Sequence, residues 1–164
     1  NIWVYRELYV KHLTAEDLAA KILEAEQLDP LPHYTVLDSS CWNKTGMGPS
    51  IAETMMRSGV RWVPSDRNRI QGKMEVHRRL GDDPYSNEPR LRIFSSCQHI
   101  IKQLAGIPLS KTNSEDVDTK AEDHAYDALR YMVMTRMSGY AAIHQQLGAI
   151  KNHVYKVQDE VFGY

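Results

Sequence analysis

Four titratable side chains crowd into one short stretch, namely Glu122, Asp123, His124 and Asp127. On a helix, positions three and four apart share a face, so His124 would sit over Asp127, with Asp123 one turn before it. Two carboxylates and an imidazole on one turn need a cation between or opposite them, and a divalent metal would supply that charge. The alternative is a solvated, acidic helix start that complements the helix dipole.

Asp38 is a second candidate, because it closes a short apolar run at residues 33–37 and is followed by a polar loop. In open α/β sheets, ligands bind outside the carboxyl ends of the strands, which is where an aspartate at this position would lie. An aspartate can equally end a strand by accepting a hydrogen bond in an Asx-turn. Both interpretations are open from the sequence.

Basic side chains gather between residues 57 and 79, where seven Lys and Arg stand against two acidic residues. Such clustering suits contacts to nucleic-acid phosphates, which carry affinity without sequence information. The formal net charge of the chain is only −1, so any such role depends on local patches. A solvated face is the alternative. The basic residues are Arg57, Arg61, Arg67, Arg69, Lys73, Arg78 and Arg79.

The overall composition is that of one globular domain: 164 residues, 42% hydrophobic and 25% charged. No apolar run approaches the length of about 20 residues that a membrane-spanning helix needs. The chain contains neither a Walker-type phosphate loop nor a G-x-S-x-G nucleophile motif. Cys41 and Cys97 lie far apart, which favours reduced thiols, with one disulfide as an open alternative.

Periodicity and turn residues predict strands alternating with helices, which is typical of a mixed sheet flanked by helices. Thr14 is the predicted N-cap of the first helix, and Ser95 or Ser96 that of a later one. The elements expected are strands over residues 2–10, 33–38, 60–64 and 91–94, and helices over residues 14–27, 50–57, about 66–80, 96–104 and about 122–137. The predicted inner faces carry Ile70, Met74 and His77 or Leu80, then Ile100, Ile101 and Leu104, then Ala128, Leu129, Met132 and Val133.

The last segment, residues 138–164, has apolar residues at alternating steps of three and four, the spacing of a coiled-coil seam. It predicts an amphipathic C-terminal helix that either packs on its own domain or docks another subunit. The seam consists of Tyr140, Ile143, Leu147, Ile150, Val154, Val157 and Val161.

Four pieces of the chain carry a resemblance to a known family. They are NIWVYRELY at residues 1–9, LDSS at residues 37–40, GPSIAE at residues 48–53 with VPSDRNRI at residues 63–70, and EDHAYDALRY at residues 122–131. Together they resemble the C-terminal nuclease domain of the large terminase subunit of tailed bacteriophages and prophages. The resemblance spans residues 1–137, and residues 138–164 match no family.

The resemblance implies a ribonuclease-H-like α/β fold and a metal-dependent endonuclease that cuts concatemeric double-stranded DNA. In that family, three acids hold two Mg²⁺ or Mn²⁺ ions, which activate water for phosphodiester hydrolysis. Asp38 resembles the second acid and Asp127 the third, with Asp123 as a further metal ligand and His124 as the neighbouring catalytic histidine. The first acid lies on an earlier strand in the family, so the resemblance places it upstream of Asn1.

The resemblance also implies partners and a compartment. The partners are double-stranded DNA, an ATPase motor domain on the same polypeptide, and a portal or small terminase subunit, all in the cytoplasm of a bacterial host. The residues expected to hold the DNA backbone are Lys44, Arg67, Arg69 and Lys73.

Two other functions are compatible with the sequence. One is a different ribonuclease-H-like nuclease, such as a resolvase or transposase core, with the same metals and another DNA substrate. The other is a non-catalytic interaction module that works through residues 138–164. A cruciform substrate separates the first from a terminase, and a tail-dependent oligomer would favour the second.

Overall fold

The computed structural model describes the chain except residues 31, 33, 45, 112–115, 119–121 and 138–164. The predicted C-terminal amphipathic helix therefore lies outside the described residues. The elements are, in order, β1 (Ile2–Val4), α1 (Ala15–Ala25), β2 (Val36–Leu37), the 3₁₀ turn η1 (Ser39–Trp42), α2 (Ile51–Arg57), β3 (Val63–Pro64), α3 (Arg69–Leu80), β4 (Leu91–Ile93), α4 (Gln98–Gly106) and α5 (His124–Met137).

The architecture is a mixed α/β arrangement, as the sequence predicts, but the described strands form two separate parallel pairs. β1 pairs with β4 in the register Ile2↔Leu91, and β2 pairs with β3 in the register Val36↔Val63. The single mixed sheet expected from the sequence is therefore not present among the described residues. Parallel strands need a crossover between them, and both pairs have helices in that connection.

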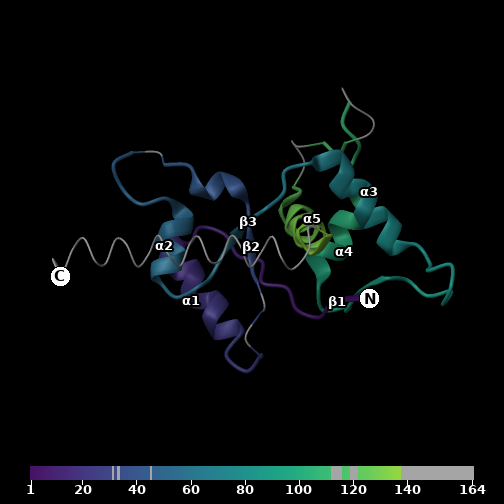
Figure 1. Cartoon of the computed structure of the whole chain (residues 1–164), viewed down its shortest axis with the longest axis horizontal. Helices are drawn as coiled ribbons and strands as arrows, with labels where there is room; N and C mark the ends of the chain where they lie inside the picture. Colours follow the sequence, from purple (N-terminus) through teal and green to yellow (C-terminus); the bar gives the residue numbers. More distant parts are fainter. Residues whose placement is uncertain (31, 33, 45, 112–115, 119–121, 138–164) are drawn as a thin grey trace.

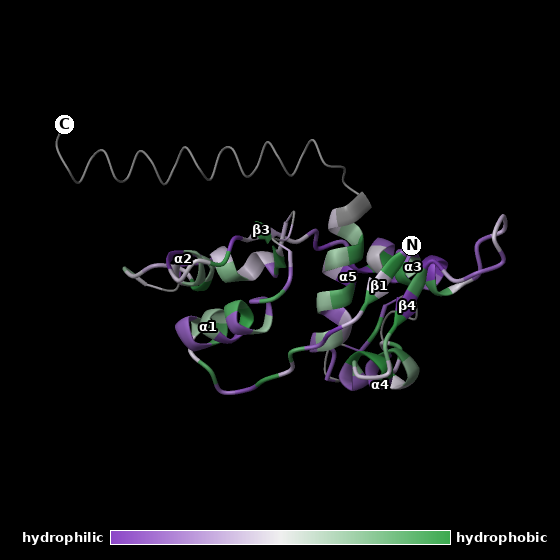
Figure 2. Cartoon of the chain, turned by 90° about the horizontal axis from the view of Figure 1, so that it is seen from below, coloured by the Kyte–Doolittle hydropathy of each residue, from purple (hydrophilic) through white to green (hydrophobic). Residues whose placement is uncertain are grey.

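Each strand pair packs on its own group of helices (Figures 1 and 2). Around β1 and β4, the helices α3, α4 and α5 bury a core that includes Ile2, Val76 and Val133. Around β2 and β3, the helices α1 and α2 enclose Ala19, Met55, Val60 and Trp62. Helix α5 packs against α3, α4 and β2, so it connects the two halves. The position of a side chain on the packed face of α5 therefore depends on contacts with both halves.

The predicted N-cap of α1, Thr14, is confirmed, and α2 also begins at a side-chain cap. The Thr14 hydroxyl accepts a hydrogen bond from the Asp17 amide at 3.1 Å. Ser50 and Glu53 form a reciprocal capping box, in which each side chain accepts from the other residue's backbone N–H. Helix α2 ends before Gly59, whose φ of 102° is a conformation that only glycine adopts readily.

The predicted inner face of α3 is wrong. Ile70 and Met74 are 38% and 67% exposed, and α3 instead buries Gly72, Glu75 and Val76. The reason is the partner helix, since α5 lies close enough to α3 to favour a glycine at the contact. Similar corrections apply to Ile101, which is exposed on α4, and to Ala128, which is exposed on α5.

Helix α4 is capped from a distant part of the chain rather than by Ser95 or Ser96. Its N-cap residue, Cys97, makes no capping bond with its side chain. Instead, the carboxylate of Glu7, whose side chain is 9% exposed, accepts hydrogen bonds from the amides of His99 at 3.0 Å and Ile100 at 2.7 Å. The strand expected over residues 2–10 thus ends at Val4, and the chain carries Glu7 across to α4.

Replacing Glu7 with Gln should destabilise the chain by about 1 kcal/mol at neutral pH, since a capping charge at a helix N-terminus is lost. Burial opposes ionisation of Glu7, but the bonds from Ile100 and His99 outweigh it and hold the pKa of Glu7 below its usual value. A lowered pKa contributes stability above the unfolded-state pKa and loses it as pH falls. Thermal unfolding of both chains at pH 7 and pH 3 should therefore converge at the lower pH. Glu88→Gln, at an exposed pair with Arg92, is the control and should change little.

Cys41 and Cys97 are both free thiols, half-buried and buried respectively, in agreement with the reduced state favoured by the sequence. Among the residues described, no helix has the length and apolar character to cross a membrane.

Candidate functional site

Asp127 lies in the first turn of α5, and neighbouring groups fix that turn. The Asp127 amide donates to the Asp123 carbonyl at 2.8 Å, which starts the helical bonding. The next contact comes from α4, where the buried Gln103 side chain accepts from the Tyr126 amide at 2.9 Å. Uncharged groups, including the Gln103 side chain of α4, therefore already fix the start of α5.

Asp38 directly follows β2 and uses its two carboxylate oxygens differently. Oδ1 accepts from the Ser40 amide at 2.8 Å, which is the Asx-turn that the sequence leaves open. Oδ2 accepts from the Tyr131 hydroxyl on α5 at 2.8 Å. The turn itself is tied to β3, because the buried Ser65 hydroxyl accepts from the Ser39 amide at 3.2 Å. Asp38 therefore both ends its strand and faces α5.

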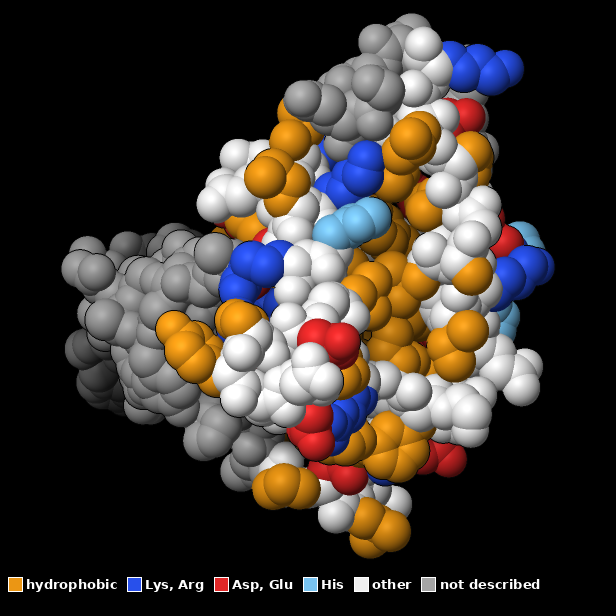
Figure 3. Space-filling view, turned by 90° about the vertical axis from the view of Figure 1, so that its right-hand side faces the viewer, with side chains coloured by type: hydrophobic (Ala, Val, Ile, Leu, Met, Phe, Trp, Pro, Cys, Tyr) orange, Lys and Arg blue, Asp and Glu red, His pale blue; other side chains and the backbone are white. Residues whose placement is uncertain are grey.

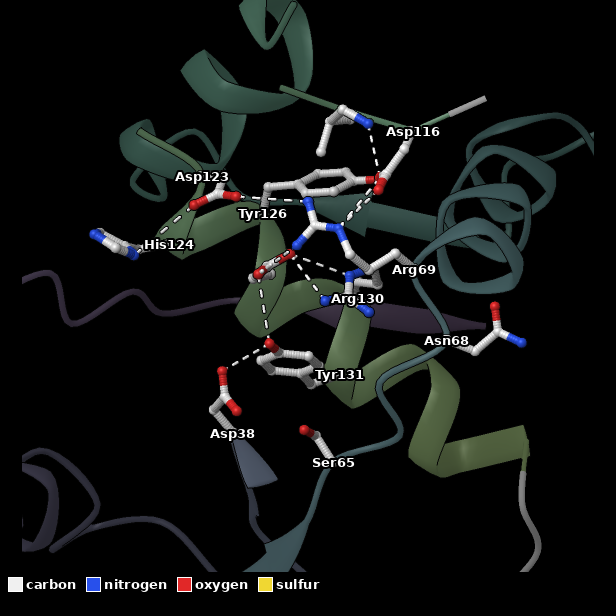
Figure 4. Close-up of polar contacts among 12 residues, drawn as sticks. Asp38, Ser65, Asn68, Arg69, Asp116, Asp123, His124, Tyr126, Arg130 and Tyr131 are labelled. Carbon is white, nitrogen blue, oxygen red and sulfur yellow. Dashed lines mark hydrogen bonds and ion pairs between the residues drawn. The ribbon is translucent and has the colours of Figure 1, made fainter. Parts of the chain in front are cut away.

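The Tyr131 hydroxyl brings Asp38 and Asp127 to one point, although Tyr131 and Asp38 are 93 residues apart (Figure 4). It lies 2.8 Å from Asp38 Oδ2 and 3.4 Å from Asp127 Oδ2. The two carboxylate oxygens can therefore be no further apart than the sum of these distances. Tyr131 was not identified from the sequence, yet it stands one helical turn after Asp127, and that spacing is a usable signal.

The electrostatics at this point favour an ionised Asp38 and a protonated Tyr131. Burial opposes ionisation of Asp38, but hydrogen bonds from Ser40 and Tyr131 outweigh it, so the pKa of Asp38 lies below its usual value. Burial, together with the hydrogen bond to Asp38, raises the pKa of Tyr131. The tyrosine therefore stays protonated, and its hydroxyl donates a hydrogen bond to the Asp38 carboxylate.

Arg69 lies among three carboxylates at the start of α3. Its Nε is 3.0 Å from Asp116 Oδ2, its Nη1 is 3.4 Å from Asp127 Oδ2, and its Nη2 is 3.7 Å from Asp123 Oδ2. Burial and the neighbouring Asp127 raise the pKa of Asp123. The cation between the acids that the sequence calls for is thus, in this structure, a guanidinium (Figure 4).

A second guanidinium, that of Arg130, meets Asp127 from the interior. Arg130 is only 2% exposed, and its Nε and Nη2 both lie 3.1 Å from Asp127 Oδ1. Asp127 therefore binds Arg130 through Oδ1, while its Oδ2 faces Arg69 and Tyr131. Arg130 was also missed from the sequence, because nothing in its spacing marks it as buried.

The other predicted site residues divide between this cluster and the surface. Asp123 is buried and directed at Arg69, whereas the His124 side chain is 79% exposed, with its Nδ1 4.0 Å from Asp123 Oδ1 (Figure 4). The Arg67 guanidinium donates to the Ser39 hydroxyl beside Asp38. Lys44 lies 3.4 Å from Glu53 on α2. Lys73 lies on α3, one turn after Arg69.

The donors at the meeting point suit a hard divalent cation in their chemistry. In the part of the chain that the structure describes, no group of three or more His, Cys, Asp or Glu side chains is arranged to hold a metal ion. Mg²⁺, however, usually retains several waters and is bound by one or two carboxylates together with substrate phosphates. Asp38 and Asp127, converging on one hydroxyl, match that mode.

Comparisons of the chain with protein-family models, with curated proteins and with solved structures give no significant match.

Proposed function

We propose that this chain is a metal-dependent DNA endonuclease domain of the terminase type, with a ribonuclease-H-like fold, which cleaves double-stranded DNA by phosphodiester hydrolysis. The observation that carries the proposal is the convergence of Asp38 and Asp127 on the Tyr131 hydroxyl. These two acids resemble the family's second and third metal ligands. Their spacing along the chain gave no reason to expect them to meet.

Asp38 and Asp127 would hold Mg²⁺ or Mn²⁺, which would supply charge for activating water and for stabilising the leaving oxygen of a phosphodiester. The protein's own part is to hold the two carboxylates directed at one point. Tyr131 does this by donating to Asp38, and Arg130 does it by binding the far oxygen of Asp127. His124 and Asp123 remain proposed contributors, on the outer and inner sides of the α5 start respectively.

The DNA backbone would approach where Asp38 is reached from solvent. Arg67 is exposed and bonds the η1 turn beside Asp38, and Lys44 follows that same turn. A second face, formed by α3, the 81–90 loop and the N-terminus, is less suitable for DNA binding. It has hydrophobic side chains around a hollow, and its Lys and Arg side chains lie apart from one another (Figure 3). We therefore propose Arg67 and Lys44 as backbone contacts ahead of Lys73 and Arg69, which lie on α3.

The test is cleavage of supercoiled plasmid by the full chain with Mn²⁺ or Mg²⁺, and again after EDTA is added. We expect nicked and linear products with metal and none with EDTA. Equal concentrations of linear duplex and of a cruciform should be compared in parallel. Preference for the cruciform would replace the terminase assignment with a resolvase, and absence of cleavage under all metal conditions would contradict an autonomous nuclease.

A further inference from the structure

Helices α3 and α5 lie very close together at Gly72. A Cβ placed on Gly72 would lie 2.5 Å from Arg130 Cγ and 2.8 Å from Arg130 Cδ, both inside the distance that real Cβ atoms keep. It would also lie 3.3 Å from Met134 Cγ. The stem of Arg130 thus passes directly over the α3 backbone at this position. A glycine within a helix is destabilising relative to alanine by about 1 kcal/mol, so its presence here has a packing reason.

The guanidinium at the end of that stem is fixed on two sides. Its Nε and Nη2 converge on Asp127 Oδ1, each at 3.1 Å. The central carbon of the guanidinium, Cζ, lies 4.5 Å from the centre of the Tyr131 ring, within cation–π distance. Arg130 therefore contacts both Tyr131, which donates to Asp38, and Asp127 beside it.

From this arrangement we infer that Arg130, seated in the space left by Gly72, is a positioning residue that turns Asp127 Oδ2 and the Tyr131 hydroxyl toward Asp38. The inference rests on the proposed function, since it concerns the orientation of a proposed metal ligand. Arg130 is remote from solvent, with 2% of its surface exposed, and so acts through Asp127 rather than on DNA.

The geometry requires an arginine at this position. A guanidinium presents Nε and Nη2 in a rigid fork and stacks on an aromatic ring, whereas a lysine ammonium is a single point of charge on a flexible stem. Lysine would keep the charge beside Asp127 but would lose the fork and the contact with the Tyr131 ring. Charge and orientation can therefore be separated experimentally.

The test is a double-mutant cycle between Gly72→Ala and Arg130→Ala in the full chain, with Arg130→Lys as a further variant. Mn²⁺ affinity is measured by titration calorimetry, and stability without metal by thermal unfolding. Each single variant and Arg130→Lys should weaken Mn²⁺ binding about tenfold or more, the range seen for partners of metal ligands. The double variant should bind no more weakly than Arg130→Ala, because the clash at position 72 has gone. Cleavage by each variant should fall mainly in kcat rather than in KM.

Gly106→Ala is the matched control, because a Cβ there meets nothing within 4 Å, and its Mn²⁺ affinity should equal that of the unaltered chain. Wild-type affinity in Arg130→Lys, or additive losses in the cycle, would overturn the positioning role while leaving the proposed function intact. If the unaltered chain neither binds Mn²⁺ nor cuts DNA, the proposed function fails. Positioning is then decided by the stability cycle alone, where additive losses overturn it.

Discussion

Asp127→Asn is expected to lower metal-dependent plasmid cleavage by more than about 100-fold, the upper end for loss of a group that merely supports a metal ligand. The amide has the shape of the carboxylate but lacks its charge, and hard divalent ions depend on that charge. The exchange acts at the point where Asp127 Oδ2 approaches Tyr131 and Asp38. Cleavage of supercoiled plasmid with Mn²⁺, at equal protein concentration, measures it.

Asp38→Asn should give a loss of the same size, since both acids serve one point. Asp82→Asn, on an exposed loop, is the control and should cleave like the unaltered chain. Circular dichroism must show that all three variants are folded. If Asp127→Asn still cleaves, Asp127 serves only as the counter-ion of Arg69 and Arg130, and the metal assignment is wrong.

Several helix boundaries could be predicted from the sequence, because they depend on side chains close by in the chain. The Thr14 cap and the extents of α2 and α5 follow from residues within one or two turns. The pairing of Asp38 with Asp127 came instead from a resemblance, because no spacing rule joins two residues so distant. Tyr131 could have been found as the residue one turn after Asp127.

The contact between Gly72 and Arg130 could not be predicted in this way. It depends on how α3 crosses α5, which neither helix encodes alone. The only trace in the sequence is a glycine inside a helical pattern, which signals a close approach without naming the partner. For the same reason the predicted inner face of α3 failed, since apolar periodicity assumes that large side chains fill the contact.

Arg69 illustrates how a basic run can mislead. Within residues 57–79 it belongs to an excess of positive charge and suggests a phosphate contact. Its partners Asp116 and Asp127 come 47 and 58 residues later, outside any window used to count charge. The structure pairs Arg69 with those acids, so a DNA contact by Arg69 would require it to leave them.

Arg69→Gln should therefore destabilise the chain by about 2 kcal/mol, less than for a fully buried pair because the Arg69 side chain is 27% exposed. Without the guanidinium, three carboxylates face each other with less compensation. The pKa of Asp123, already raised by burial and by Asp127, should rise further. Since a raised carboxyl pKa gives stability at low pH that is lost as pH rises through it, the deficit should shrink on acidification. Urea unfolding at pH 7.5 and pH 4.5 measures it.

Three comparisons separate this role from a DNA contact. Arg78→Gln removes a half-exposed partner of the buried Glu75 on the same helix. It should cost less than about 1 kcal/mol, because Arg79 still pairs with Glu75 at 2.6 Å. Adding Asp123→Asn to Arg69→Gln should recover part of the lost stability, because one of the repelling charges is gone.

DNA binding gives the third comparison. Arg67→Ala should reduce the slope of log affinity against log salt concentration by about 1, the value for one phosphate contact, whereas Arg69→Gln should leave that slope unchanged. A reduced slope in Arg69→Gln with normal stability would instead make Arg69 a DNA ligand and its ion pairs incidental.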